Sequence, residues 1–190
     1  MKRFDMMSRK FKMLIIISIC SFLLLSNLVV SPKSMGSTVE GLFINEIMSS
    51  NVTTITAIDV GKSDWIELYN AGDAQIDLSG FSLSDSETQW AFPDQTTIPS
   101  KGFLLVWASG SVSSVGTNGE LHTNFKISKD GEPIVLTMPG GVIVDEIDVP
   151  VLKDDESYGR YPDGSQWTMY AKGSATPNAS NLDPNPVPVT

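Results

Sequence analysis

Short runs of alternating apolar and polar side chains, separated by turn residues, make up most of the chain after residue 41. The clearest run is 64–70, which is dense in aromatic and branched residues and leads into the turn sequence Asn70-Ala71-Gly72-Asp73. Because side chains alternate across a strand, Ile66 and Leu68 share one face, and the other face carries Trp65, Glu67 and Tyr69. The pattern therefore predicts a β-strand at 64–70.

The same criteria predict many further short strands, at 42–48, 76–78, 81–84, 90–93, 103–107, 121–127, 134–137, 142–145 and 167–170. The run 103–107 is almost wholly apolar, as in a strand that is buried on both faces. The runs on either side of Pro139-Gly140-Gly141 predict a β-hairpin. Because no stretch after residue 36 repeats with a helical period, the chain is expected to be an all-β sandwich or barrel.

The first 36 residues have the features of an export signal. Basic residues precede an apolar run at 13–30, and Pro32 and the small residues Ser34 and Gly36 follow it. An uncleaved membrane anchor is the alternative, because about 18 apolar residues can begin to span a bilayer. We favour a cleaved signal because of Pro32 and the small residues. The protein is then secreted or at the cell surface, with membrane contact only through 13–30 if the segment is retained.

The composition of the chain after residue 36 argues against disulfide bonds and against nucleic-acid binding. The single cysteine, Cys20, lies in the apolar run, so no disulfide is expected after residue 36. Of 13 Lys and Arg residues 6 lie in 1–36, and of 22 Asp and Glu residues only Asp5 does, which leaves a charge of 7 − 21 = −14. A charge of this sign repels phosphate backbones and argues against nucleic acid as a partner.

Several stretches together resemble the lamin tail domain, in the branch found in exported prokaryotic proteins. They are, in order, 44–48, 64–70, 76–85, 90–93, 102–108, 121–126, 131–136 and 157–164, with Trp167 and Thr176-Pro177. The resemblance implies an immunoglobulin-like β-sandwich at 37–181, preceded by a signal or anchor helix at 1–36 and followed by a proline-rich tail at 182–190. It also implies a structural or interaction module. The basic surface and the nuclear-import signal of lamins are missing.

The sequence after residue 36 offers few candidates for catalytic residues. His122 is the only histidine, and no Gly-x-Ser-x-Gly nucleophile turn accompanies it, so we expect it to hold a neighbour through its ring nitrogens. Glu46 and Glu67 could form the carboxylate pair of a glycosidase. The alternative is that each is a solvated strand residue, or that one forms a salt bridge with Arg160, the only arginine after residue 36. We expect neither to be catalytic.

Acidic residues near the last strands are candidate Ca²⁺ ligands: Asp145, Glu146, Asp148, Asp154, Asp155 and Glu156. No EF-hand loop supports that role, so the favoured interpretation is a solvated acidic edge that discourages aggregation. A sugar-binding platform of tryptophans is a further alternative, and exposure of Trp90 and Trp167 would favour it.

We expect eight residues to serve the structure: Trp65, Glu67, Tyr69, Trp107, His122, Tyr158, Arg160 and Trp167. Arg160 is expected to anchor its loop on backbone carbonyls or a carboxylate. The expected function is non-catalytic, in adhesion, scaffolding or assembly, with an unknown protein or cell-surface partner and no cofactor unless Ca²⁺ binds. A calcium- or carbohydrate-binding module is the alternative, and a small hydrolase comes third.

Overall fold

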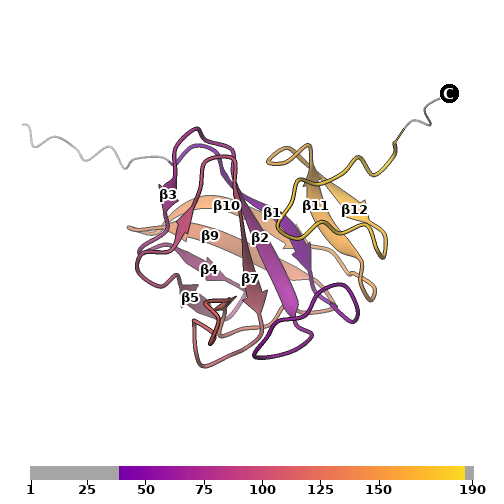
Figure 1. Ribbon diagram of the computed structural model, residues 1–190, viewed down its shortest axis with the longest axis horizontal. Coiled ribbons are helices and arrows are strands. Elements are labelled where there is room, and N and C mark those ends of the chain that lie inside the picture. Colours follow the sequence, from indigo (N-terminus) through magenta and orange to yellow (C-terminus); the bar gives the residue numbers. More distant parts are fainter. Residues whose placement is uncertain (1–38, 187–190) are drawn as a thin grey trace, which may run out of the picture. The chain divides into compact units, whose positions relative to one another are not determined.

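The structure, a computed structural model, describes residues 39–186, which form twelve strands and no helix (Figure 1). The largest sheet has six strands in the order β12-β11-β1-β2-β7-β8. Their bounds are Gln166–Tyr170, Ser157–Tyr161, Leu42–Met48, Asp64–Asn70, Phe103–Ala108 and Leu121–His122. Neighbouring strands are antiparallel except β7 and β8, which are parallel.

The second sheet has four antiparallel strands in the order β10-β9-β4-β5. They span Val142–Val149, Glu132–Met138, Ser82–Ser84 and Gln89–Ala91, and β9 and β10 form the hairpin that the sequence predicts around residues 139–141. A two-stranded sheet joins β3 (Ile76–Asp77) to β6 (Thr97–Ile98).

The main core lies between the two larger sheets. One buried cluster contains Ile44 and Ile66 from the first sheet together with Leu83 and Leu136 from the second. These side chains occupy alternate positions of their strands, so each sheet buries one apolar face against the other. The result is an all-β architecture of several sheets, consistent with an immunoglobulin-like sandwich.

A β-bulge in β1 controls which side chains face this core. The register between β1 and β2 shifts between Ile44, which pairs with Leu68, and Glu46, which pairs with Glu67. Asn45 is the extra residue, so Ile44 and Ile47 both face the core although three positions separate them. The bulge thereby turns Glu46 to the outer face of the sheet, opposite Glu67.

The outer face of the six-stranded sheet is also covered. A second buried cluster there contains Met48, Ala57, Trp65 and Trp107, and Ala175 packs against it. Residues 174–182, which we call the C-terminal strap, return from β12 toward β1 and cover this face (Figure 1). Strand β2 is therefore buried on both sides.

Two sequence expectations need correction. Only the second half of β7 is fully buried, because Phe103, Leu104 and Leu105 are partly exposed and Phe103 stacks on Tyr69. The expected strand at 121–127 is reduced to Leu121–His122. After these two residues the chain turns, and Thr123 Oγ1 donates a hydrogen bond to the carbonyl oxygen of Phe125 at 2.7 Å.

The expected signal or anchor segment at 1–36 lies outside the described residues. Between residues 39 and 186, no helix is present that could cross a membrane.

Candidate functional site

Four of the six acidic candidates for Ca²⁺ ligation bond to donors within the protein, and Glu146 and Asp148 are exposed. Asp145 receives two hydrogen bonds from Arg160 Nη2, at 2.9 and 3.0 Å. Asp154 accepts a 2.6 Å hydrogen bond from Ser50 Oγ, and Glu156 lies 3.5 Å from Lys153 Nζ. Within 39–186, no three of the six offer oxygens close enough to hold one ion.

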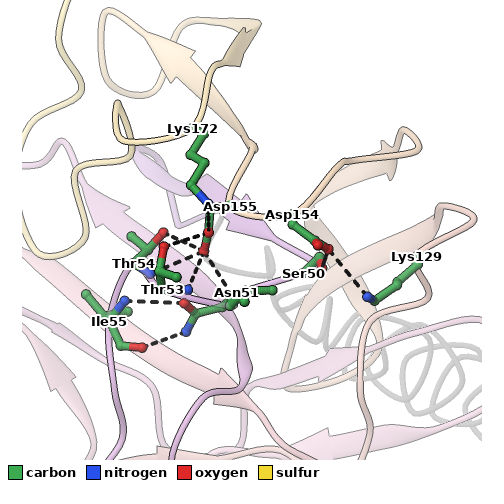
Figure 2. Close-up of polar contacts among 10 residues, drawn as sticks. Ser50, Asn51, Thr53, Thr54, Ile55, Lys129, Asp154, Asp155 and Lys172 are labelled. Atoms are coloured by element: carbon green, nitrogen blue, oxygen red, sulfur yellow. Dashed lines mark hydrogen bonds and ion pairs between the residues drawn. The ribbon is translucent and has the colours of Figure 1, made fainter.

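Asp155 is the most heavily bonded of them (Figure 2). Its Oδ1 accepts hydrogen bonds from the backbone N–H groups of Val52 (2.8 Å), Thr53 (2.7 Å) and Thr54 (3.2 Å). Its Oδ2 accepts from Thr53 Oγ1 at 2.7 Å and pairs with Lys172 Nζ at 2.9 Å. The carboxylate therefore fixes the start of the loop between β1 and β2.

These bonds favour the ionised form of Asp155. Burial would raise the pKa of Asp155, but the hydrogen bonds from Lys172, Thr53 and Val52 outweigh burial and hold the pKa far below its usual range. With its acceptor sites engaged by protein donors, the carboxylate is a structural group.

Replacing Asp155 with Asn tests this role. The native backbone has φ = 62° at this position, which Asn tolerates, so the substitution changes mainly the side-chain chemistry. We expect the melting temperature to fall by roughly 5 °C or more, because an amide group then faces backbone donors and Lys172 loses its partner. Limited proteolysis should cut the loop 50–63 faster than in the native protein.

The exposed Asp130 provides the matched control, because Asp130→Asn makes the same chemical change where the side chain accepts no hydrogen bond. Equal melting temperatures for the two variants would contradict the structural role of Asp155.

Arg160 joins three elements. Its Nε donates to the carbonyl oxygen of Ile44 at 2.9 Å, its Nη1 to that of Ser165 at 2.6 Å, and its Nη2 to Asp145 on β10. The guanidinium also lies 4.5 Å from the ring centre of Trp167. The residue holds the edges of the two large sheets together.

The tryptophans do not offer a sugar-binding platform on the described surface. Trp65, Trp90 and Trp107 are buried, and Trp90 Nε1 donates to Ser114 Oγ at 2.9 Å. Trp167 is half-buried and stacks on Tyr158, with ring centres 4.9 Å apart. The exposure that would favour carbohydrate binding is therefore missing at Trp90.

Glu46 and Glu67 are fully buried, so the interpretation of both as solvated strand residues is wrong. Neither pairs with Arg160, because Asp145 occupies that guanidinium. Burial raises the pKa of Glu67 to about 8 and also raises the pKa of Glu46. The bulge at Asn45 and the strap explain the burial, which the strand pattern alone does not reveal.

The strap binds these two carboxyl groups through its backbone. The N–H of Thr176 donates to Glu46 Oε2 at 3.1 Å, and the N–H of Asn178 donates to Glu67 Oε2. Ser157 Oγ also donates to Glu46, at 2.6 Å. Because the strap covers both groups, a sugar cannot reach them, and they are unsuited to glycosidase chemistry.

His122 lies at one end of the sandwich, as the last residue of β8, and is 1 % exposed. Its Nδ1 lies 3.2 Å from Ser109 Oγ. The only histidine is thus beside a serine, as a catalytic pair requires, but the residue is almost fully buried. The contact with Ser109 orients the ring.

His122 also lies close to two carboxylates. Asp59, Glu120 and His122 each offer one ligand atom, and these three atoms lie within 4.8 Å of one another. Asp59 comes from the loop between β1 and β2, and Glu120 from the loop between β7 and β8. The sequence alone does not indicate either acid, because some 60 residues separate Asp59 from its partners and no motif spans that gap.

Hydrogen bonds hold the two loops together. Thr117 donates to Asp59 through its Oγ1 and its backbone N–H, both at 2.6 Å, and Glu120 Oε2 accepts from the N–H of Ile58 at 2.9 Å. The bonds from Thr117 keep the pKa of Asp59 below its usual value. A pocket of about 160 Å³ lies beside them, lined in part by Val60, Val115 and His122.

The family model of the lamin tail domain matches residues 36–150, which is more than half of the chain. No curated protein matches the chain. Strands β11 and β12 and the strap lie beyond the matched stretch but complete the same sheet and its cover. The all-β sandwich and the family match agree, and the chain belongs to the lamin tail domain family.

Proposed function

We propose that this protein is a non-catalytic, exported interaction module that binds a protein partner at the cell surface through the loops at one end of its sandwich. The observation that carries the proposal is a group of exposed aliphatic side chains on the two loops around His122: Ile58, Val60, Val112 and Val115. Val112 is fully exposed. Apolar side chains gathered on a soluble surface mark interaction sites more often than isolated ones do.

The loops are held in place before any partner binds. Ala57 and Gly61 exchange two backbone hydrogen bonds, at 2.9 and 3.1 Å, which close the first loop into a tight turn. The bonds from Thr117 to Asp59 and from Ile58 to Glu120 tie it to the second loop. A binding surface that is already ordered loses less conformational entropy when a partner binds.

A non-catalytic role fits the rest of the molecule. The carboxyl groups of Glu46 and Glu67 lie under the strap, and the ring of His122 is covered. The remaining charge of −14 after residue 36 disfavours nucleic acid. Export rests on the basic, apolar and small-residue pattern of residues 1–36.

Site-specific photo-crosslinking on the source cells tests the proposal. A photoreactive amino acid in place of Val112 should crosslink to a defined partner protein. The same substitution at Val151, which is also exposed but lies after β10, serves as the control and should give no such product. Crosslinks of equal yield at both positions, or none at Val112, would contradict a binding site on these loops.

A further inference from the structure

Three potential metal ligands from two loops and a strand lie close together, next to the exposed aliphatic side chains of Val60 and Val115. They are the carboxylates of Asp59 and Glu120 and the imidazole of His122, with one ligand atom from each within 4.8 Å of the others. In the part of the chain from 39 to 186, they form the only such group of three. Acidic residues alone would not indicate a bound ion. The evidence for an ion therefore depends on whether the ring nitrogens of His122 have hydrogen-bond partners.

His122 Nε2 is buried and has no hydrogen-bond partner among the described residues. A buried polar atom without a partner is destabilising, so it calls for a ligand. On the other side of the ring, Nδ1–H can donate to Ser109 Oγ, which leaves a lone pair on Nε2, and both Nε2 and Asp59 Oδ2 lie next to Gly116. Metal-binding histidines are commonly oriented in this way through their second nitrogen.

Gly116 keeps the space between the ligands open. A Cβ atom built on Gly116 would collide with Asp59 Oδ2 and lie 3.0 Å from His122 Nε2. Gly116 does not have a positive φ, so its backbone conformation does not require glycine. The absence of a side chain here instead leaves room where an oxygen and a nitrogen ligand face each other.

One imidazole and two carboxylates are a ligand set typical of zinc. Zn²⁺ binds His nitrogen and carboxylate oxygen at about 2.0–2.2 Å, and catalytic or exchangeable sites often use three protein ligands with a fourth position open. Such a tetrahedral site needs ligand atoms roughly 3.3 Å apart, so the ligand atoms, which lie within 4.8 Å of one another, must approach by at most about 1.5 Å. Ca²⁺ prefers six to eight oxygen ligands, which this group does not supply.

We propose that Asp59, Glu120 and His122 bind one divalent transition-metal ion of the zinc type. The ion would join the loop between β1 and β2 to the loop between β7 and β8 and satisfy the buried nitrogen of His122. It would also offset the two carboxylate charges. The proposal does not depend on the partner protein proposed above, because it concerns an ion that the chain binds by itself.

The test uses Zn²⁺ alone, added to the purified full chain without a polyhistidine tag. Because His122 is the only histidine of the chain, its imidazole NMR signals are unambiguous. We expect calorimetry to give one Zn²⁺ per chain and the Nε2 signal to shift on binding, while Ca²⁺ moves neither. Asp59→Asn and Glu120→Gln should each weaken binding by about tenfold or more.

Matched controls are Asp148→Asn and Glu146→Gln, which remove the same charges from exposed positions on β10. They should bind Zn²⁺ as the native protein does. Both ligand substitutions lie on surface loops, so folding can be verified from the rest of the NMR spectrum. Binding that leaves the histidine signals unchanged, equal affinity in the ligand and control variants, or no binding at all would overturn the proposal.

Discussion

The free energy of unfolding of this protein should fall as the pH rises from about 5 to about 9, and Glu67→Gln should flatten that dependence. Burial raises the pKa of Glu67 to about 8 and also raises the pKa of Glu46. In the unfolded chain both carboxyl groups titrate near their usual values. The folded protein therefore binds more protons in this interval.

Proton linkage explains why the free energy of unfolding falls as the pH rises. A carboxyl group whose pKa is raised by folding contributes its full stability below the unfolded pKa and loses that contribution as the pH rises through the folded value. One such proton gives a limiting slope of about 1.4 kcal/mol per pH unit. Asp64, whose pKa burial raises to about 6, adds to the lower part of the same interval. Asp155 acts with the opposite sign, but only in strong acid, because its pKa is lowered.

Urea denaturation at a series of pH values measures this slope. The difference between native protein and Glu67→Gln isolates one carboxyl group, since the general repulsion among the many acidic residues is present in both. Glu87→Gln is the matched control, because Glu87 is exposed and its side chain makes no hydrogen bond in the structure. If Glu67→Gln kept the native slope, Glu67 would have to be ionised in the folded protein across the whole range.

The sequence predicts the framework well, because strands with alternating apolar residues are local signals. The runs at 42–48 and 64–70 form β1 and β2 with the expected bounds, and the hairpin around residues 139–141 is present. The family resemblance is confirmed by the match to residues 36–150.

What the sequence does not reveal depends on contacts between distant residues. Glu67 has the pattern of a solvated strand residue, and only the bulge at Asn45 and the strap, more than 100 residues away, make it a buried group. Asp155 could not be told apart from its acidic neighbours, because its donors come from residues 52–54. The neighbours of His122 were missed for the same reason.

Outside the apolar core, the side chain whose removal should lower the free energy of unfolding most is that of Asn181. Its Nδ2 donates to the carbonyl oxygens of Arg160 at 2.9 Å and Asn45 at 3.3 Å, and its Oδ1 accepts from Thr176 Oγ1 at 2.7 Å. Asn181 is buried, and it fastens the end of the strap to β1 and β11. The strap in turn covers Glu46 and Glu67.

Asn181→Ala should therefore lower the free energy of unfolding by about 2–4 kcal/mol, because two carbonyl groups and one hydroxyl, all buried or part-buried, lose their partner together. Asn185→Ala is the control, since Asn185 follows in the same segment but is exposed and its side chain makes no hydrogen bond in the structure. Urea denaturation gives the loss, and proteolysis of 171–186 shows whether the strap has detached. A loss as small as that of Asn185→Ala would mean that the strap is held by apolar contacts such as Ala175 against the Trp65 cluster, and not by Asn181.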